Sequence, residues 1–249
     1  MATAKKQEVM ASQDNMPAYM KDKMMDQRGN ENVGTDDVQL PRIDVLQALS
    51  PQIKKSDPDY IDGAEQGMLF NTLTGDLYEE LQFIPVYVRK RWLLWKDRKA
   101  GGGLRGVADS EAEAKAKLAE LDDRDQVEIV DTHENIVLIV EKDGTLTEAI
   151  WSLAKSKAKV ARKFNSLVRL NGGPRFSRVY TMLPFEDENA AGEAYWNMAI
   201  GKSTQWPTQE QFEYAEALYE SISQGSRKVG ADYTEEAPAA DGDVEASEI

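Results

Sequence analysis

The longest strand-like run of the chain, Leu81–Trp95, sets the strongest limit on its fold. Branched and aromatic side chains are frequent in this run, and Pro85 is its one breaker, so we predict a long strand that bends or is interrupted there. Shorter strand patterns with turn signals between them fill most of the chain from about Gly67 onward. The core of this protein is therefore expected to be built on β-sheet.

The other elements follow from local patterns. Ser110 with Glu113, and Thr208 with Gln211, have the spacing of capping boxes that open helices. Further strands are expected at Met68–Leu73, Val127–Val130, Ile136–Val140, Leu146–Leu153, Phe176–Leu183 and Tyr195–Ile200. Helices are expected at Pro41–Ser50, from Ser110 to about Leu121, at Lys155–Leu170 and from Thr208 onward. Helices inserted among short strands favour a mainly β (α+β) fold, a small barrel with decorations, over alternating βαβ units.

Composition excludes several kinds of site. The chain has no cysteine, which rules out disulfides, a thiolate nucleophile and Cys-based metal sites. The single histidine, His133, falls in an expected turn between two strands and argues against a Ser-His-Asp triad or a His-rich metal site. We therefore predict no enzymatic activity, no cofactor and no bound metal. No apolar run approaches about 18 residues, so neither a signal peptide nor a membrane span is expected.

The charge is distributed unevenly. The 30 Lys+Arg and 44 Asp+Glu residues give a formal net charge of −14. Yet Val88–Arg105 has seven bases and one acid, and Trp151–Tyr180 has eight bases and no acid. Gly230–Ile249 is the opposite, with seven acids and no base. Two basic stretches in an acidic protein suit local binding of a polyanion by a chain that stays soluble overall.

In the first basic stretch, aromatic residues alternate with cations. Alternate residues of a strand share one face. That face would carry Tyr87, Arg89, Arg91 and Trp95, with Lys96 and Arg98 next to it. Trp92 and Trp95 have opposite parity, so we expect one buried indole and one accessible indole, Trp95 being the accessible one. Proteins bind single-stranded nucleic acid in this way: cations lie along the phosphates, and each base that stacks on an aromatic ring contributes about 1–3 kcal/mol. The alternative is that both tryptophans belong to the core and the cations only solvate an edge strand.

The second basic stretch has its cations along one side of the expected helix and just beyond it. They are Lys155, Lys159, Arg162, Lys163, Arg175 and Arg178. Solvated helices normally mix charge signs to form i,i+4 pairs, but this stretch contains no acid. Like charges repel one another, which points to an anionic partner. The alternative is an ordinary solvated face.

The chain divides into four parts by composition. Residues 1–39 are expected to form a flexible arm, 40–205 the nucleic-acid-binding domain, 206–229 a C-terminal helix and 230–249 a disordered acidic tail. Such a tail can occupy a cationic groove of its own chain, compete with DNA there, and be displaced to recruit other proteins.

Short motifs also carry a family likeness. They are Pro41-Arg42-Ile43, Leu46-Gln47, Ser50-Pro51, Gly67-Met68-Leu69-Phe70-Asn71-Thr72, Thr74-Gly75, Phe83-Ile84-Pro85-Val86, Trp95 ahead of the Gly101–Gly103 loop, and the acidic C-terminus. Together, over about residues 40–200 and the tail, they resemble the single-stranded DNA-binding proteins of tailed bacteriophages. The resemblance implies a five-stranded OB-fold barrel that binds single-stranded DNA without sequence preference in replication and recombination, in the cytoplasm of an infected bacterial cell.

The resemblance further implies that the acidic tail contacts replication or recombination proteins. The tail residues expected to do so are Asp241, Asp243, Glu245, Glu248 and Ile249. Related tails often end in an aromatic residue, whereas this one ends in Glu248-Ile249, so the groove is the firmer expectation.

Two other functions stay open at this point. A metal-dependent nuclease could use carboxylates that lie near one another in sequence, namely Asp131, Glu134, Glu141 and Asp143. An acidic adaptor or inhibitor could bind a host protein through its negative surface. The sequence separates neither DNA from RNA nor a monomer from a homo-oligomer.

Overall fold

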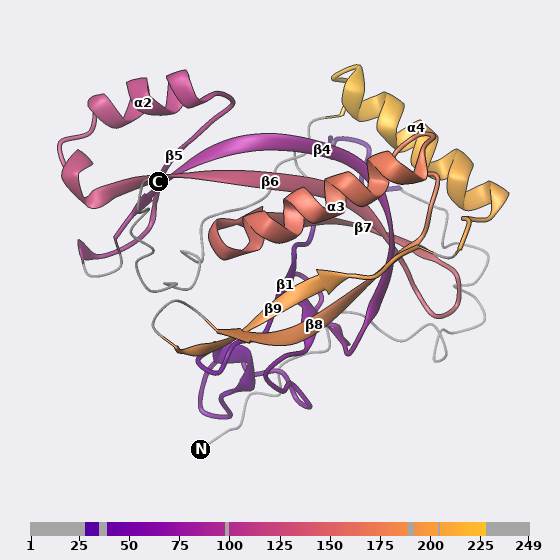
Figure 1. The fold of residues 1–249 in the computed structure, drawn as a ribbon, viewed down its shortest axis with the longest axis horizontal. Helices are drawn as coiled ribbons and strands as arrows, with labels where there is room; N and C mark the ends of the chain where they lie inside the picture. The colour runs from indigo at the N-terminus through magenta and orange to yellow at the C-terminus, as the bar shows by residue number, and fades with distance from the viewer. Residues whose placement is uncertain (1–27, 35–38, 98–99, 189–191, 204, 228–249) are drawn as a thin grey trace.

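A strongly bent antiparallel sheet forms the centre of the computed structural model, which describes residues 28–34, 39–97, 100–188, 192–203 and 205–227 (Figure 1). Its strand order is β7-β6-β4-β8-β9, and β5 pairs with the far end of β4. The strands are β4 (Leu81–Lys96), β5 (Leu104–Ala108), β6 (Val127–Val140), β7 (Leu146–Ala154), β8 (Tyr180–Glu188) and β9 (Ala194–Ile200). The predicted bend is confirmed, because the β4–β6 register shifts between Pro85 and Tyr87.

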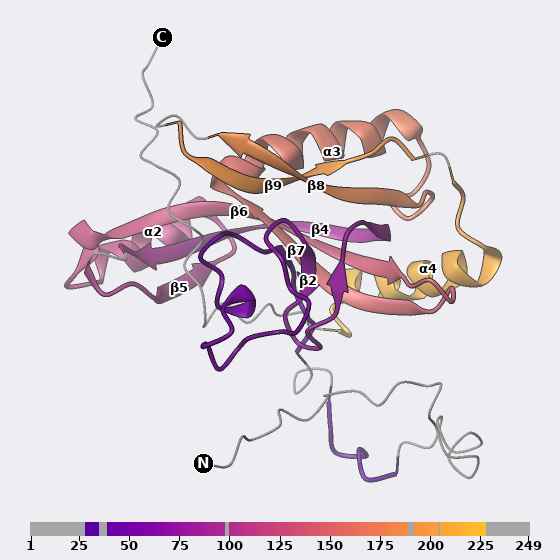
Figure 2. The same cartoon turned by 90° about the horizontal axis from the view of Figure 1, so that it is seen from below.

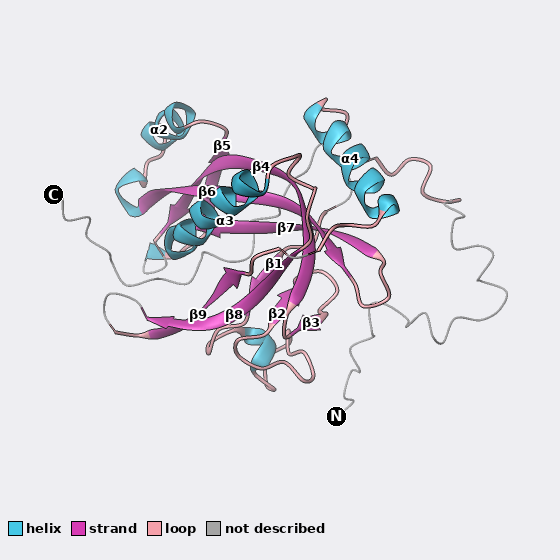
Figure 3. Ribbon diagram, turned by 45° about the vertical axis from the view of Figure 1, so that its right-hand side comes forward, coloured by secondary structure: helices cyan, strands magenta, loops and turns pink. Residues whose placement is uncertain are grey.

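A second, small sheet lies beside the β8–β9 hairpin (Figure 3). It has the order β1-β2-β3, from β1 (Ile43–Val45), β2 (Leu69–Asn71) and β3 (Leu77–Tyr78). Arg42, just before β1, forms a parallel bridge with Ile150 of β7. On the other side, the Gln47 side chain pairs with the backbone of Trp196 in β9, donating to its carbonyl at 2.7 Å and accepting from its N–H at 2.9 Å. The β1 segment thus joins β7 to β9.

Both faces of the long strands are buried, each under a different helix (Figure 2). On one face, Phe164 of α3 (Ala158–Asn171) packs among Phe83, Trp151 and Tyr180, with ring centroids 5.3–5.8 Å from its own. On the other face, α4 (Gln209–Ser223) covers strand residues of opposite parity with Phe212, Ala215 and Leu218. In the second half of β6, the even residues Ile136, Leu138 and Val140 belong to the core under α4, and the odd residues Val137 and Ile139 belong to the core under α3.

The remaining helices are short. Helix α2 (Glu111–Ala119) packs against the β4–β5 end of the sheet, where Ala114 contacts Leu94 and Ala108. The predicted caps are confirmed: the Ser110 hydroxyl accepts from the Glu113 N–H, and Thr208 with Gln211 forms a full capping box. One-turn 3-10 helices lie at Pro51–Ile53, Arg124–Gln126 and Lys155–Lys157. None of the helices in the described ranges is both long enough and apolar enough to cross a membrane.

Two predicted elements are wrong. Pro41–Ser50 is not a helix but contains β1, in which Ile43 and Val45 point inward and Asp44 does not. Val127–Val140 is one strand rather than two, so His133 lies half-buried within β6, opposite Lys90 and Leu153, and not in a turn.

The fold class is mainly β with helices (α+β), as predicted. The described strands form two antiparallel sheets rather than a closed barrel, because β7 and β9 do not pair with each other within the described residues. Most of the expected flexible arm and all of the acidic tail lie outside the described residues; of the arm, residues 28–34 and 39 are described, with turns and no helix or strand.

Candidate functional site

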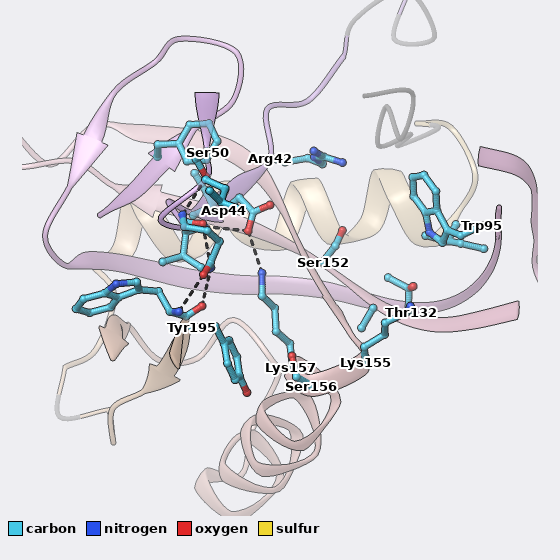
Figure 4. Close-up of a pocket in the computed structure, with 18 of the residues that line it drawn as sticks. Arg42, Asp44, Ser50, Trp95, Thr132, Ser152, Lys155, Ser156, Lys157 and Tyr195 are labelled. Atoms are coloured by element: carbon cyan, nitrogen blue, oxygen red, sulfur yellow. Dashed lines mark hydrogen bonds and ion pairs between the residues drawn. The ribbon is translucent and has the colours of Figure 1, made fainter. Parts of the chain in front are cut away.

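A cavity of about 260 Å³ opens where β1, β7 and the start of β9 come together at the end of β4 and β6 (Figure 4). Its lining combines aromatic and aliphatic side chains with hydroxyls and three cations. The residues that matter below are Arg42, Asp44, Phe70, Leu93, Trp95, Thr132, Ser152, Ala154, Lys155, Lys157, Tyr195 and Trp196. This cavity draws residues from both basic stretches: Leu93 and Trp95 come from the first, and Lys155 and Lys157 from the second.

The register of the sheet explains the floor of the cavity. Thr132 of β6 lies opposite Ala154 of β7, and the next residue pair on that face is Glu134 and Ser152. Leu93 and Trp95 continue the same face on β4. Since directly opposite residues project to the same side of a sheet, two hydroxyls and two apolar side chains share the floor.

One wall of the cavity is fixed by backbone contact. Gly67 has a φ of +89°, and a Cβ at this position would lie 2.8 Å from the Trp196 ring. Only glycine allows this conformation and this approach together. The Gln47 amide holds the Trp196 backbone from the other direction. The indole is therefore positioned by groups that leave it little room to move.

The rim carries the cations. Lys155 Nζ lies 2.7 Å from Glu128, and Lys157 Nζ lies 2.9 Å from Asp44. Lys155 also has a φ of +48°, the one positive value at a non-glycine position among the residues described. Backbone strain of this kind is often found at functional sites. The lining contains three bases and one acid, so it is positive overall.

The charge of Asp44 is stabilised where it lies. Its partial burial would raise its pKa, but the charge and hydrogen bond of Lys157 and the N–H of Val45 outweigh burial and hold the pKa below its usual value. Asp44 is therefore ionised and partly neutralises Lys157 at neutral pH.

The first basic stretch is not the open cationic face that we predicted. Lys90 and those of the predicted cations that the structure describes each pair with an acid: Arg89 with Glu134, Lys90 with Asp131, Arg91 with Asp109 and Lys96 with Asp123. Glu134 is fully buried. Tertiary pairing thus neutralises most of this stretch. Arg98 lies outside the described residues.

The expected aromatic residues of that stretch are also placed differently. Tyr87 is half-buried and packs beneath α4, with its ring centroid 6.2 Å from that of Tyr219, so only part of the ring is open to a ligand. Trp95 is only 5% exposed, whereas Trp92 is half-buried with Lys90 Nζ 5.1 Å from its ring. The accessible indole was therefore assigned to the wrong residue. Trp95 nevertheless lines the cavity.

The second basic stretch separates into three groups. Lys155 reaches the cavity. Lys159, Arg162 and Lys163 are exposed on the outer face of α3 and form no ion pair with any residue in the described ranges.

The third group is packed into the structure. Arg175 donates to Asn135 at 2.8 Å and to Asn165 at 3.1 Å, and burial lowers its pKa to about 10. It has a structural role that conflicts with the predicted phosphate contact. Arg178 is half-buried and stacks on the ring of Trp206.

The carboxylates of the nuclease alternative do not come together. Asp131 and Glu134 pair with Lys90 and Arg89, and Glu141 accepts from Tyr78. Asp143 accepts from Thr145. Within the part of the chain that the structure describes, no group of three or more His, Asp or Glu side chains could hold a metal. The predicted tail residues lie outside that part.

Several cavity residues are not among those predicted from the sequence. Lys157 lies in the acid-free stretch but off the helical spacing that selected its neighbours. Tyr195 and Trp196 are adjacent aromatic residues at the start of a predicted strand, which is a signal that could have been used. Thr132 and Ser152 carry no local signal, since only the strand register brings them together.

Comparisons with known proteins add one finding. A family model described as Pam3 phage gp34-like protein matches residues 5–228. No curated protein and no solved structure matches the chain.

Proposed function

The chain belongs to the Pam3 phage gp34-like family, and from this premise we propose that it is a phage protein that binds single-stranded nucleic acid without catalysis. We propose single-stranded DNA as the ligand, bound without sequence preference during phage DNA replication or recombination. The observation that carries the proposal is the cavity, in which aromatic walls, hydroxyls and a positive rim meet.

The chemistry of the cavity suits a nucleotide strand. Single-strand sites combine cations that follow the phosphates with apolar and aromatic surfaces that receive the bases. Here Lys155, Lys157 and Arg42 lie around surfaces formed by Trp196 and Leu93. The ion pairs of both lysines have partly exposed acids, with side chains 62% exposed for Glu128 and 35% exposed for Asp44. Such pairs contribute at most about 1 kcal/mol of stability, so a phosphate can take the place of the acid.

The arrangement of the strands supports an OB-fold-like assignment, which we include in the proposal. OB-folds are partly open five-stranded barrels that bind oligonucleotides on the face of their second and third strands and with nearby loops. In this chain β4, β6 and β7 would be the first three strands, and β8 and β9, after α3, the last two. Thr132 and Ser152 then belong to the second and third strands, and Tyr195 to the start of the fifth. The β1 segment would fill the gap between β7 and β9.

The outer face of α3 offers a path for the backbone beyond the cavity. Helix α3 follows directly from Lys155–Lys157, so a strand that contacts these lysines can continue toward Lys159, Arg162 and Lys163. Competition by the acidic tail, and recruitment of replication proteins through it, remain part of the proposal.

Fluorescence anisotropy with labelled oligonucleotides tests the proposal. We expect single strands to bind more tightly than duplex of equal length, and affinity to fall steeply with salt because counterions are released. Equal affinity for duplex, or affinity that is insensitive to salt, would contradict it. Incubating the same samples with Mg²⁺ or Mn²⁺ and measuring oligonucleotide length separates a binding protein from a nuclease.

A further inference from the structure

We propose, on the basis of the function proposed above, that the cavity receives one unstacked nucleobase of the bound strand. The base edge would meet the hydroxyls of Ser152 and Thr132, and its phosphate would lie at Lys155 and Lys157. Binding of single-stranded nucleic acid requires only surface contacts, so insertion of a base into a cavity is a further proposal beyond the binding function.

The two hydroxyls on the cavity floor have few hydrogen-bond partners within the protein. Ser152 Oγ is buried and has no hydrogen-bond partner. Thr132 is 1% exposed, and its hydroxyl reaches only the Val130 carbonyl of its own strand, at 3.4 Å. Buried polar groups normally have a partner, so both hydroxyls are suited to a ligand with polar edges.

The surroundings of the hydroxyls fit a flat ring. Ala154, opposite Thr132, is small and packs against Leu93 and Trp95, which share the floor, so apolar side chains surround the two hydroxyls. The volume of about 260 Å³ lies just below the roughly 300–1,000 Å³ of ordinary small-molecule pockets, which suits one nucleotide unit rather than a run of bases. Bases that leave a stack are held in this way, between apolar side chains and with hydrogen bonds to their edges.

The type of polar group explains why such a cavity need not select a sequence. A hydroxyl both donates and accepts hydrogen bonds, so Ser152 and Thr132 can each serve either kind of group on a base edge. Strong selection uses amide or guanidinium groups that bond one base at two points. The floor offers neither: the Gln47 amide is bonded to the Trp196 backbone, and the Arg42 guanidinium lies with the cations of the rim. This agrees with binding that is indifferent to sequence.

Three probes test base insertion by anisotropy or by quenching of tryptophan fluorescence. They are a short oligothymidylate, a chain of equal length and charge built from abasic deoxyribose phosphates, and thymidine monophosphate. The variants are Ala154→Leu, which fills the cavity, and Ser152→Ala with Thr132→Val, which remove the hydroxyls at nearly constant shape. Ala199→Leu, at a half-buried alanine of β9 that does not line the cavity, is the matched control. Thermal unfolding establishes that each variant folds.

The wild type should bind the oligothymidylate about tenfold or more tightly than the abasic chain. Ala154→Leu should remove this preference while leaving affinity for the abasic chain unchanged, and Ala199→Leu should retain it. The hydroxyl variants should reduce the preference severalfold. Glu134, which lies opposite Ser152, also has a carboxylate oxygen without a hydrogen-bond partner. If the role of Ser152 is only structural, toward this carboxylate, Ser152→Ala should change the unfolding temperature and leave the preference for the oligothymidylate intact.

The probes distinguish failure of the inference from failure of the proposed function. If the oligothymidylate binds but its preference over the abasic chain survives Ala154→Leu, base insertion is wrong and single-strand binding stands. If thymidine monophosphate binds as tightly as the oligothymidylate and Ala154→Leu abolishes both, the cavity takes a base but the ligand is a free nucleotide. If none of the probes binds, both proposals are wrong.

Discussion

Asp44 is the residue that limits how strongly the cavity can attract a phosphate. It lies 2.9 Å from Lys157 Nζ and is the one acid among the lining residues described, which include three bases. A phosphate that binds Lys157 has to displace this carboxylate. The pair therefore opposes the proposed ligand while it stabilises the empty cavity.

Replacing either partner should change affinity in opposite directions. Asp44→Asn removes the competing charge and should tighten oligothymidylate binding about threefold to tenfold at low salt, because Lys157 becomes available. Lys157→Gln should weaken binding by a similar factor and lower the slope of log K against log salt by about 0.7. Anisotropy titrations over a salt series measure both effects. Weakening by both variants would show that Asp44 positions the cavity rather than competes for its cation.

The same pair predicts a dependence of stability on pH. Because the pKa of Asp44 is lowered in the folded protein, its ionised form stabilises the fold fully above the ordinary aspartate pKa of about 3.9. That contribution is lost as pH falls further, through the lowered pKa. In urea unfolding, the free energy of unfolding of the wild type should therefore exceed that of Asp44→Asn by about 1 kcal/mol at about pH 7. This gap between the two free energies should narrow below about pH 4. A gap that stays constant over this range would disprove the ion-pair explanation.

At the scale of elements, sequence patterns identified strands and helices wherever local chemistry decides. The capping pairs at Ser110 and Thr208 are examples, since a side chain and a nearby N–H suffice. The stretch from Asp131 to Asn135 has the polarity of a turn but continues β6. Its polar side chains find partners from other elements, such as Lys90 for Asp131 and Arg175 for Asn135.

The segment around β1 is an element that local sequence patterns do not predict. The spacing of Ile43, Leu46 and Leu49 suggested a helix, yet Leu49 is 79% exposed and Ile43 pairs with Asn71. A period of three over ten residues cannot be distinguished from the alternation of Ile43 and Val45 without knowing that β2 lies alongside. Tertiary pairing decides this element.

The contact between Gly67 and β9 gives a prediction at this scale. Gly67→Ala adds a Cβ 2.8 Å from the Trp196 ring at a φ of +89°, so both strain and overpacking should destabilise the protein. Gly144→Ala is the matched control, with a φ of +87° and no atom within 4 Å. We expect about 1 kcal/mol for Gly144→Ala and a further 1–3 kcal/mol, roughly, for Gly67→Ala, measured by urea unfolding.

Only Gly67→Ala should also change the tryptophan emission of the native state and weaken oligothymidylate binding. Equal losses of stability and unchanged emission in the two variants would mean that Trp196 does not depend on this contact.

At the scale of the whole molecule, the distribution of charge predicted only part of the candidate site. The sequence shows that a segment lacks acids, but not which acids from other segments fold against it. Asp109, Asp123 and Glu134 neutralise cations of the first stretch. On the outer face of α3, Lys159, Arg162 and Lys163 form no ion pair within the described residues. Asp187 of β8 is close enough for the charge of Lys159 to help lower its pKa, but it makes no direct pair, so the second stretch retains most of its charge.

This difference makes α3 the decisive element for the path of a bound strand. The triple variant Lys159→Gln, Arg162→Gln and Lys163→Gln should weaken oligonucleotide binding and lower the salt slope by about 2, since each phosphate contact with a single strand contributes about 0.7. The control triple Lys55→Gln, Lys142→Gln and Lys202→Gln changes the net charge equally at exposed positions outside α3. It should reduce affinity only slightly and keep the slope, because uniform charge acts weakly at a distance in salt. Binding to short oligonucleotides that fill only the cavity should be the same in both triples. If the two variants share one slope with long oligonucleotides, the strand does not follow α3, and its cations serve another purpose.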